Sequence, residues 1–360
     1  MNKHAINQQF KKGLLLYNEV DYEKNKWFAN QLITKAEQFG LELTLVLREN
    51  LTLTIENGQF FASIMAEPSL TSDVASLSMT EPSPSLGVSS LNVAELSLTS
   101  NVASLNVAEP SPTGNVSTLD KNNTFLKCKL SPNDVDFVIN RTRDTLIAVH
   151  FEKMGCRVFN NSTVTELCNH KGKTHQLVNS ANIPSVKTML GNIHYFKPSQ
   201  LPFPYPVILK AVSGHGGSEI YKLNNENELT EHIAALRTED FILQELCSNP
   251  GIDVRVFTLG KETLAAVKRV STQSFKSNYS LGGSATAYTL KPEEEAMVKT
   301  ILNLLDFDLA GIDFILDKEG RFLFNEIEDV VGTRTLYLNY NFDVVEIFLD
   351  YIKRQLFSNS

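Results

Sequence analysis

Short apolar runs and longer amphipathic stretches alternate along the first part of the chain. Residues 13–17 form an apolar run, and residues 21–39 then place apolar side chains three or four positions apart, up to Gly40. The first pattern is typical of a buried strand and the second of an amphipathic helix that ends at a glycine. We expect the apolar face of this helix to carry Trp27, Phe28, Leu32, Ile33, Ala36 and Phe39.

The same alternation returns later and predicts an open α/β layer in the N-terminal part of the chain. The further elements expected are strands over 41–47, 136–140 and 157–159 and a helix over 144–153. Asn18, Arg141 and Arg143 follow two of these strands. Because ligands of open α/β sheets bind beyond the carboxyl ends of the strands, these three residues are candidates for a substrate pocket. The alternative is that they only begin helices or cover the surface.

A predicted β-hairpin in the last part of the chain carries three carboxylates. Two strand-like runs surround its short turn, over 311–316 and 322–328. Side chains alternate along a strand, so Glu326 and Glu328 should share a face, and pairing across the turn can bring Asp313 beside them. Converging carboxylates favour a hard divalent cation such as Mg²⁺. The alternative is a solvated acidic hairpin, which we disfavour because Phe324 falls on the same alternating positions.

The segment from Ala66 to Lys121 is a tandem repeat of four 14-residue units. The units are rich in Ser, Thr, Leu, Val and Asn, contain recurrent Pro and have no aromatic residue. Such a composition buries little surface to offset the entropy of ordering, which favours a disordered insertion, and a long surface insertion costs little closure entropy. A small stacked solenoid is the alternative, since repeated units can bury a shared face.

The overall composition is that of an ordinary globular protein. The chain has 360 residues, of which 42% are hydrophobic and 21% charged, enough for more than one domain. Its net charge of -8 gives no electrostatic footprint for nucleic acid or an anionic membrane. The four cysteines form no CxxC pair, so neither a zinc site nor a disulfide framework is indicated. No apolar stretch is long enough to span a membrane, and we expect a cytoplasmic protein.

A lysine and a glycine-rich loop form a candidate nucleotide site. Lys210 ends the apolar strand 206–210 and can direct its ammonium group at phosphate oxygens. The loop after it has small side chains apart from His215, so its backbone amides can surround a triphosphate. The loop residues assigned to the nucleotide are Ser213, Gly214, Gly216 and Gly217.

With these residues, the stretch from about 169 to 340 resembles an ATP-grasp protein, nearest to the RimK-like carboxylate-amine ligases. The resemblance implies that Lys171 and Lys210 contact the nucleotide phosphates. It implies that the strand ending in Gln244, Glu245 and Leu246 lies along the adenine. It also implies that the metal ligands are Asp313, Glu326 and Glu328.

The same resemblance assigns residues around the reacting groups. The family's Gly-x-Asp-x-Arg strand is similar to residues 251–255, which contribute Asp253 to the nucleotide site and Arg255 to catalysis. Arg269 is then the main candidate for stabilising an acyl phosphate, with Arg255 and Asn278 in support. An exposed cross-strand pair of Arg255 and Arg269, worth little in stability, is the alternative.

The fold implied is ATP-grasp, of the α/β class, with an N-terminal pre-ATP-grasp layer and the repeat insertion. We expect an N-terminal domain over 1–168, interrupted by the insertion 66–121, then a central subdomain over 169–245 and a C-terminal subdomain over 246–360. One departure from the family is Glu328, where the usual Glu-x-Asn motif has Asn. The added negative charge should tighten metal binding, and the number of ions, one or two, stays open.

The implied activity is an ATP- and Mg²⁺-dependent ligase that forms an amide or peptide-like bond through an acyl phosphate, with Mn²⁺ as a second possible ion. Such chemistry depends on positioned cations more than on a nucleophile. The alternatives are a phosphotransferase on the same scaffold and a non-catalytic ATP-binding regulatory protein. Expected partners are small-molecule or peptide carboxylate and amine substrates, and a homo-oligomer, but neither nucleic acid nor a membrane.

Overall fold

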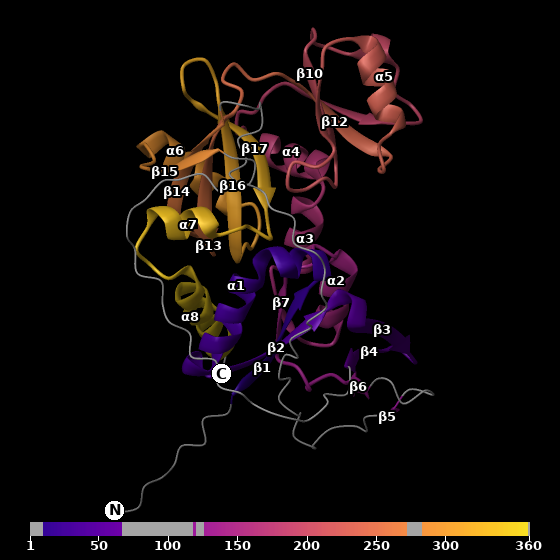
Figure 1. Ribbon diagram of the computed structural model, residues 1–360, viewed down its shortest axis with the longest axis vertical. Coiled ribbons are helices and arrows are strands. Elements are labelled where there is room, and N and C mark those ends of the chain that lie inside the picture. The colour runs from indigo at the N-terminus through magenta and orange to yellow at the C-terminus, as the bar shows by residue number, and fades with distance from the viewer. Residues whose placement is uncertain (1–9, 67–117, 120–125, 272–282, 359–360) are drawn as a thin grey trace, which may run out of the picture.

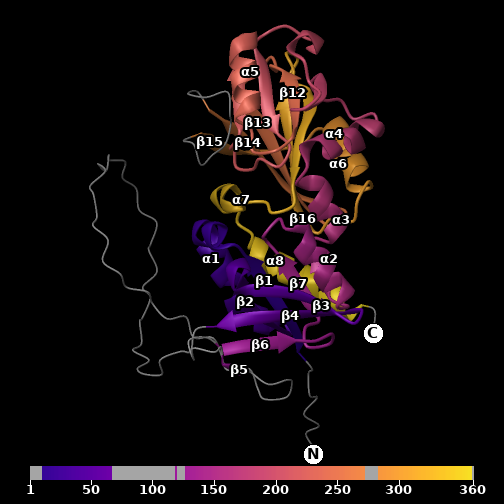
Figure 2. The same cartoon turned by 90° about the vertical axis from the view of Figure 1, so that its right-hand side faces the viewer.

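The computed structural model describes residues 10–66, 118–119, 126–271 and 283–358. Its elements form three groups along the long axis, as Figures 1 and 2 show from two sides. The N-terminal layer lies at the base, the C-terminal sheet lies above it, and a small central sheet lies at the top. The parts are therefore stacked in an order that differs from their order in the sequence.

The N-terminal layer is a four-stranded parallel sheet in the order β2-β1-β7-β8. The strands are β1 (Lys11–Tyr17), β2 (Leu41–Leu47), β7 (Phe137–Asn140) and β8 (Arg157–Phe159). The helices are α1 (Glu19–Ala36), α2 (Thr145–Lys153) and the short 3-10 turns Glu37–Phe39 and Arg48–Asn50. Gly40 follows the 3-10 turn Glu37–Phe39, which continues α1, and has a φ of 75°, the left-handed conformation that ends a helix. The predicted α/β layer is thus confirmed.

Trp27 departs from the apolar face expected for α1. Phe28, Leu32 and Ala36 are buried as the periodicity predicts, but Trp27 is 56% exposed. Its ring packs edge-on against the ring of Tyr337, with 4.8 Å between the two ring centroids. The reason is that, at 3.6 residues per turn, Phe28, Ala29, Leu32 and Ala36 share one face of the helix and Trp27 falls outside it.

A second, antiparallel sheet lies beside this layer and was not predicted. It contains β3 (Leu51–Glu56), β4 (Gln59–Ala66), β5 (Thr118–Leu119) and β6 (Leu126–Leu130), in the order β3-β4-β6-β5. Ala66 of β4 pairs with Leu126 of β6, and the chain between them re-enters the sheet at β5, which pairs with the other side of β6. Most of the repeat segment lies outside the described residues, and its predicted disorder stays a prediction.

The central sheet is antiparallel in the order β11-β10-β12-β9. Its strands are β9 (Thr188–Asn192), β10 (Val207–Ala211), β11 (Ile220–Leu223) and β12 (Asp240–Glu245). Helix α5 (Glu226–Ala234) packs on the sheet through Leu229, next to Phe241. The 3-10 turn Pro198–Gln200 lies in the β9–β10 connection, and α3 (Ser162–Cys168) and α4 (Lys171–Ser180) lead into this sheet from the N-terminal layer.

The C-terminal sheet has five antiparallel strands in the order β15-β14-β13-β16-β17. They are β13 (Ile252–Leu259), β14 (Glu262–Val270), β15 (Ser284–Tyr288), β16 (Leu309–Leu316) and β17 (Phe322–Glu328). On one face Val254, Ile312 and Phe314 join the core that includes α6 (Pro292–Leu302). The other face carries the charged residues described below.

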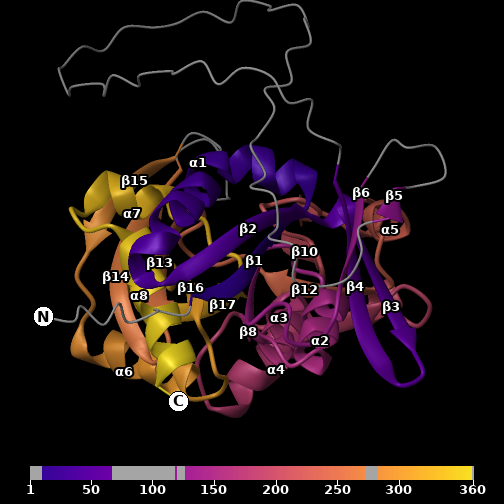
Figure 3. The ribbon, with the colours of Figure 1, turned by 90° about the horizontal axis from the view of Figure 1, so that it is seen from below.

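The last helices tie the C-terminal part to the N-terminal layer. They are α7 (Arg334–Asn339) and α8 (Val344–Phe357). Helix α8 packs beside α1 on one side of the layer, opposite β3 and β4 (Figure 3). Lys35 of α1 lies 2.5 Å from Asp343 and 2.6 Å from Glu346 at the start of α8. Arg157 of β8 makes a further link, because it donates to Asp308 just before β16 at 2.6 Å.

Within the described ranges, no helix is long and apolar enough to cross a membrane.

Candidate functional site

A pocket lies between the central sheet and the C-terminal sheet. Apolar walls come from Val186, Ile208 and Ile315. The predicted site residues that line it are Lys210, Gly217, Gln244, Glu245, Leu246, Asp253, Asp313 and Glu326. Residues far apart in the sequence thus meet at the place where the nucleotide is expected.

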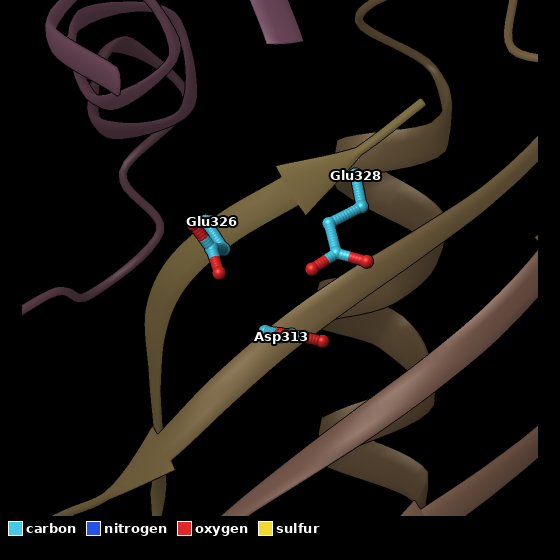
Figure 4. Close-up of side chains that lie close together, drawn as sticks. All are labelled: Asp313, Glu326 and Glu328. Carbon is cyan, nitrogen blue, oxygen red and sulfur yellow. The ribbon is translucent and has the colours of Figure 1, made fainter. Parts of the chain in front are cut away.

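Three carboxylates converge at one end of this pocket, as predicted. One ligand oxygen from each of Asp313, Glu326 and Glu328 lies within 4.8 Å of the others. Figure 4 shows the two glutamates on β17 turned toward Asp313 on the neighbouring strand. Asp313 is 1% exposed. The solvated acidic hairpin is therefore wrong for Asp313, whereas Glu326 and Glu328 keep 24% and 29% of their side chains exposed.

A β-bulge in β17 turns the glutamates toward the pocket. Phe314 pairs with Phe324 while Asp313 pairs with Glu326, so Asn325 is an extra residue in the strand. An extra residue reverses the alternation of side chains beyond it. Phe324 consequently points into the apolar core, and our expectation that it shares a face with the glutamates is wrong.

Two buried arginines surround the carboxylates. Arg255 donates to both oxygens of Asp313 at 2.7 Å, and Arg269 donates to Asp313 at 2.8 Å. Arg269 also forms a two-pronged contact with Asp253, at 2.7 and 2.5 Å, and Arg255 lies 2.7 Å from Glu328. The arginines are 7% and 4% exposed, so the exposed cross-strand pair considered above is wrong.

These contacts set the charges of the site. Burial alone would raise the pKa of Asp313, but Arg255 and Arg269 outweigh it and lower that pKa to about 2. Burial raises the pKa of Glu328, with Arg255 acting against it. For Lys210, burial and then the charge of Lys171 lower the pKa to about 8, although Glu326 opposes them. The site therefore holds an ionised aspartate and a lysine whose charge needs an anionic partner.

Both predicted lysines reach the acidic end of the pocket. Lys171, at the start of α4, donates to the carbonyl oxygen of Gly214 and lies 3.5 Å from Glu326. Lys210 donates to Asn325 Oδ1 at 2.7 Å. Asn325 is a site residue that sequence reasoning missed, because only the bulge brings its side chain toward the lysine.

The glycine-rich loop follows β10 and bends where only glycine fits easily. Gly216 and Gly217 have φ values of 61° and 82°, and a Cβ on Gly214 would lie 2.8 Å from the Ser218 carbonyl oxygen. Ser213 is exposed in the same loop. Burial lowers the pKa of His215, the charge of Arg143 acts in the same direction, and the charge of Asp21 opposes them. The loop therefore lies close to the N-terminal layer.

Strand β12 brings further polar side chains to the pocket. Gln244 at the end of β12 contacts Thr188 of β9 and His175 of α4 through its amide nitrogen. Glu245 accepts from the Lys187 backbone N–H at 3.1 Å. Sequence reasoning missed His175 and Thr188, and the helical spacing of His175 from Lys171 is the only signal that could have pointed to it.

The remaining candidates are Asn278 and the three residues that follow strands of the N-terminal layer. Asn278 lies outside the described residues, so its assignment stays a prediction. Asn18 caps α1 and donates to Asp21 at 3.0 Å, and Asp21 lies 2.5 Å from Arg143. Arg141 donates to the Val331 carbonyl oxygen at 2.9 Å. These residues cluster at the carboxyl ends of β1 and β7, as expected, and also hold neighbouring segments together.

The donor set fits a hard cation and a polyphosphate. The three converging groups offer only carboxylate oxygens, the ligands that Mg²⁺ and Mn²⁺ prefer. Lys171 and Lys210 stand beside them with the loop amides nearby. For a triphosphate with a bound divalent ion, the two lysines would therefore neutralise the phosphates and the three carboxylates would bind the ion.

Comparison with known proteins agrees with this geometry. The sequence model of the RimK-like ATP-grasp domain matches residues 168–352, just over half of the chain. Alpha-aminoadipate--LysW ligase LysX of Saccharolobus solfataricus is 28% identical over 235 residues, covering 61% of this chain and 83% of that protein. Beta-citrylglutamate synthase B of Danio rerio is 28% identical over 216 residues, 58% of this chain and 53% of its own length.

A solved structure extends the likeness to nearly the whole chain. The VanG D-Ala:D-Ser ligase from Enterococcus faecalis superposes with a TM-score of 0.63 at 15% sequence identity. The superposition covers 96% of this chain and 99% of that one. At this identity the similarity concerns the fold, and it includes the N-terminal layer that the family match leaves out.

Proposed function

The chain belongs to the RimK-like ATP-grasp family of ATP-dependent carboxylate-amine ligases, and we propose that it joins a carboxylate to an amine at the pocket between its central and C-terminal sheets. The observation that carries this proposal is the meeting of two lysines with three carboxylates at one end of that pocket. Binding and charge neutralisation supply most of the catalysis in phosphoryl transfer. A pocket with this charge pattern suits that task.

The proposed reaction has two steps. A carboxylate oxygen of the first substrate attacks the γ-phosphorus of ATP, the bond to the β-phosphate oxygen breaks, and ADP leaves. The nitrogen of the second substrate then attacks the acyl carbon, the carbon–oxygen bond to phosphate breaks, and the amine loses a proton. The products are an amide, ADP and phosphate, and no covalent enzyme intermediate is needed.

The residues take the following proposed roles. Lys171 and Lys210 hold phosphate oxygens, together with the amides of Ser213, Gly214, Gly216 and Gly217. Gln244, Glu245 and Leu246 border the base, and Asp253 keeps Arg269 in place. Arg269 and Arg255 stabilise the charge that develops on the acyl phosphate, and Asn278 assists them.

Asp313, Glu326 and Glu328 would hold the divalent cation, with Mg²⁺ as the expected ion and Mn²⁺ as a substitute. When bound, the ion neutralises phosphate charge and polarises the oxygens of the transferred group. Arg255 already contacts Asp313 and Glu328, so it orients both carboxylates before the nucleotide arrives. Asp313 Oδ2 already accepts from both arginines and Oδ1 from one, so Oδ1 has the lone pair that Asp313 can offer the ion.

The substrates are proposed from chemistry and from the relatives. The relatives' names refer to α-aminoadipate, to the protein LysW and to β-citrylglutamate, so we propose a small or peptide-borne carboxylate and an amine. Both would enter beside the Gly-rich loop, where Asp21 and Arg143 offer one charge of each sign. Such a pair suits a substrate that carries an ammonium and a carboxylate.

The experiment that tests this function is Mg²⁺-dependent release of ADP against pools of amino acids, small carboxylic acids and short peptides. We expect release that requires a carboxylate and an amine together, and its loss in Lys210→Ala and Glu326→Ala. Lys173→Ala is the matched control, because Lys173 lies on the same helix as Lys171 but pairs with Glu166 at 2.6 Å. Release that needs a hydroxyl compound and no amine would instead identify a phosphotransferase.

A further inference from the structure

The two lysines of the pocket are held in different ways. Lys171 donates to the carbonyl oxygen of Gly214 and lies 3.5 Å from the carboxylate of Glu326. Lys210 instead donates to Asn325 Oδ1 at 2.7 Å, and within the described part of the chain it forms no ion pair. The second lysine is therefore held by a neutral group.

The contact between Lys210 and Asn325 joins two sheets across the pocket. Lys210 belongs to β10 of the central sheet and Asn325 to β17 of the C-terminal sheet, and both residues line the pocket. A lysine ammonium group carries only donors, so the amide atom that faces it is the oxygen. Asn325 is the extra residue of the bulge in β17. The bulge therefore places a hydrogen-bond acceptor where the side chain of Lys210 ends.

Burial makes this acceptor necessary. Lys210 is 7% exposed, and a buried donor without a partner is costly. Burial, which the charge of Glu326 offsets only in part, lowers the pKa of Lys210 to about 8. An amide oxygen satisfies the ammonium group without adding a negative charge, whereas a carboxylate at the same place would neutralise it. Lys210 is therefore held in place while its positive charge stays available to the pocket.

We propose that Asn325 is a positioning residue for the nucleotide phosphates. It holds the ammonium group of Lys210 through a neutral acceptor, so that the lysine meets the phosphate chain in a fixed place and with its full charge. A side chain that is already ordered loses less conformational entropy when the ligand binds. This inference rests on the proposed function only in that the pocket binds a nucleoside triphosphate whose phosphates contact Lys210.

The test compares equilibrium binding of ATP with Mg²⁺ and of adenosine to the full chain and its variants. The two ligands share the base and the ribose, so the difference between their affinities reports the contribution of the phosphates. We expect Asn325→Leu to weaken ATP binding about tenfold, the effect of losing about one hydrogen bond, and to leave adenosine binding within twofold. Leu keeps a branched side chain of comparable size but offers no acceptor.

Further variants connect the effect to Lys210 and to the neutrality of the acceptor. In a Lys210→Met background, Asn325→Leu should change ATP binding by less than twofold, because the group that Asn325 positions is gone. Asn325→Asp keeps an acceptor of the same size but adds a negative charge, and it should weaken ATP binding at least tenfold.

Leu323→Val is the matched control, because Leu323 lies on the same strand but does not line the nucleotide pocket. It should leave the binding of both ligands within twofold. A melting curve for each variant shows that it is folded, and Asn325→Asp serves as the test if Asn325→Leu does not fold.

The outcomes are separable from those of the ligase assay. Unchanged ATP binding in Asn325→Leu or in Asn325→Asp would overturn the inference while the ligase proposal stands. Equal weakening of ATP and adenosine binding, or an effect of Asn325→Leu that persists in the Lys210→Met background, would also overturn it, because the effect would then come from packing. A wild-type protein that binds ATP but joins no carboxylate to an amine would contradict the ligase proposal alone, and one that does not bind ATP would overturn both.

Discussion

Two buried aspartates on the same stretch of chain, Asp308 and Asp313, have opposite electrostatic environments. Asp313 receives hydrogen bonds from two buried arginines, and its pKa falls to about 2 in spite of burial. Asp308 receives one from Arg157 and one from Tyr351, at 2.6 and 2.9 Å, and burial raises its pKa to about 6. At the junction between the layers, burial determines the direction of the pKa shift of Asp308. In the pocket, the guanidinium groups determine the direction of the pKa shift of Asp313.

The comparison separates a functional site from a structural contact. A carboxylate that must meet a cation and phosphate has to be ionised at every working pH, and two guanidinium groups ensure this for Asp313. Asp308 only joins the N-terminal layer to the C-terminal sheet, and either protonation state can accept a hydrogen bond. The following changes test this difference, from the largest expected effect to the smallest.

Arg269→Met should have the largest effect, because it leaves Asp253 and Asp313 buried with fewer positive partners. Removing one member of a buried ion pair costs roughly 3–5 kcal/mol, so we expect a fall in unfolding free energy of that order, measured by denaturant unfolding. ADP release should fall by more than about a hundredfold, since charge-stabilising groups in active sites are worth that much. Lys268→Met, the preceding residue of β14, is the control and should cost at most about 1 kcal/mol.

Asp308→Asn should change how stability depends on pH. The folded state raises the pKa of Asp308 above its ordinary value, so the folded state binds this proton more tightly. Asp308 therefore opposes folding near pH 7, and this cost disappears as the pH falls through about 6 toward 4, by on the order of 3 kcal/mol. As the pH falls over this range, we expect the melting temperature of the wild type to rise relative to that of the variant. Parallel pH profiles would contradict the assignment.

Glu328→Asn should weaken the response to the divalent ion. The substitution restores the amide usual in the family and removes one of three converging negative charges. Ligand charge count tunes cation affinity, so we expect the Mg²⁺ concentration for half-maximal ADP release to rise about tenfold, or about 1.4 kcal/mol. An unchanged Mg²⁺ requirement would remove Glu328 from the ligand set.

Ile312→Val should have the smallest effect. Ile312 is fully buried on the apolar face of β16, opposite the charged face to which Asp313 belongs. The loss of one methyl group costs about 1 kcal/mol, visible in denaturant unfolding. ADP release should stay within twofold of the wild type. A large fall in activity would mean that the two faces of the sheet are coupled.

Local patterns made the N-terminal sheet and the acidic hairpin predictable. The apolar runs of β1 and β2 and the period of α1 are set by neighbouring residues, and so is the turn between β16 and β17. In the sheet of β3, β4 and β6, the β3–β4 hairpin with its Asn57-Gly58 turn is a local signal that sequence reasoning missed, whereas β6 pairs with β4 across a long insertion. Such pairing depends on residues far away in the sequence.

The site was predictable in its residue types and less so in its geometry. Alternation assigned Glu326 and Glu328 to one face but could not reveal the bulge at Asn325, which depends on pairing with β16. Alternation also placed Arg255 and Arg269 on a common face without showing that the face is covered. His175 was missed because its one local signal is its spacing of four residues from Lys171 on α4.

The packing of α8 against α1 has a consequence for synthesis of the protein. Lys35 and its partner Asp343 are separated by 308 positions, so α1 leaves the ribosome long before the helix that covers it. Phe28 and Leu32 belong to a core that includes Phe348 and Leu349 of α8. The N-terminal layer therefore keeps an uncovered apolar surface until α8 has been synthesised, and a chaperone that binds nascent chains would have a defined target there.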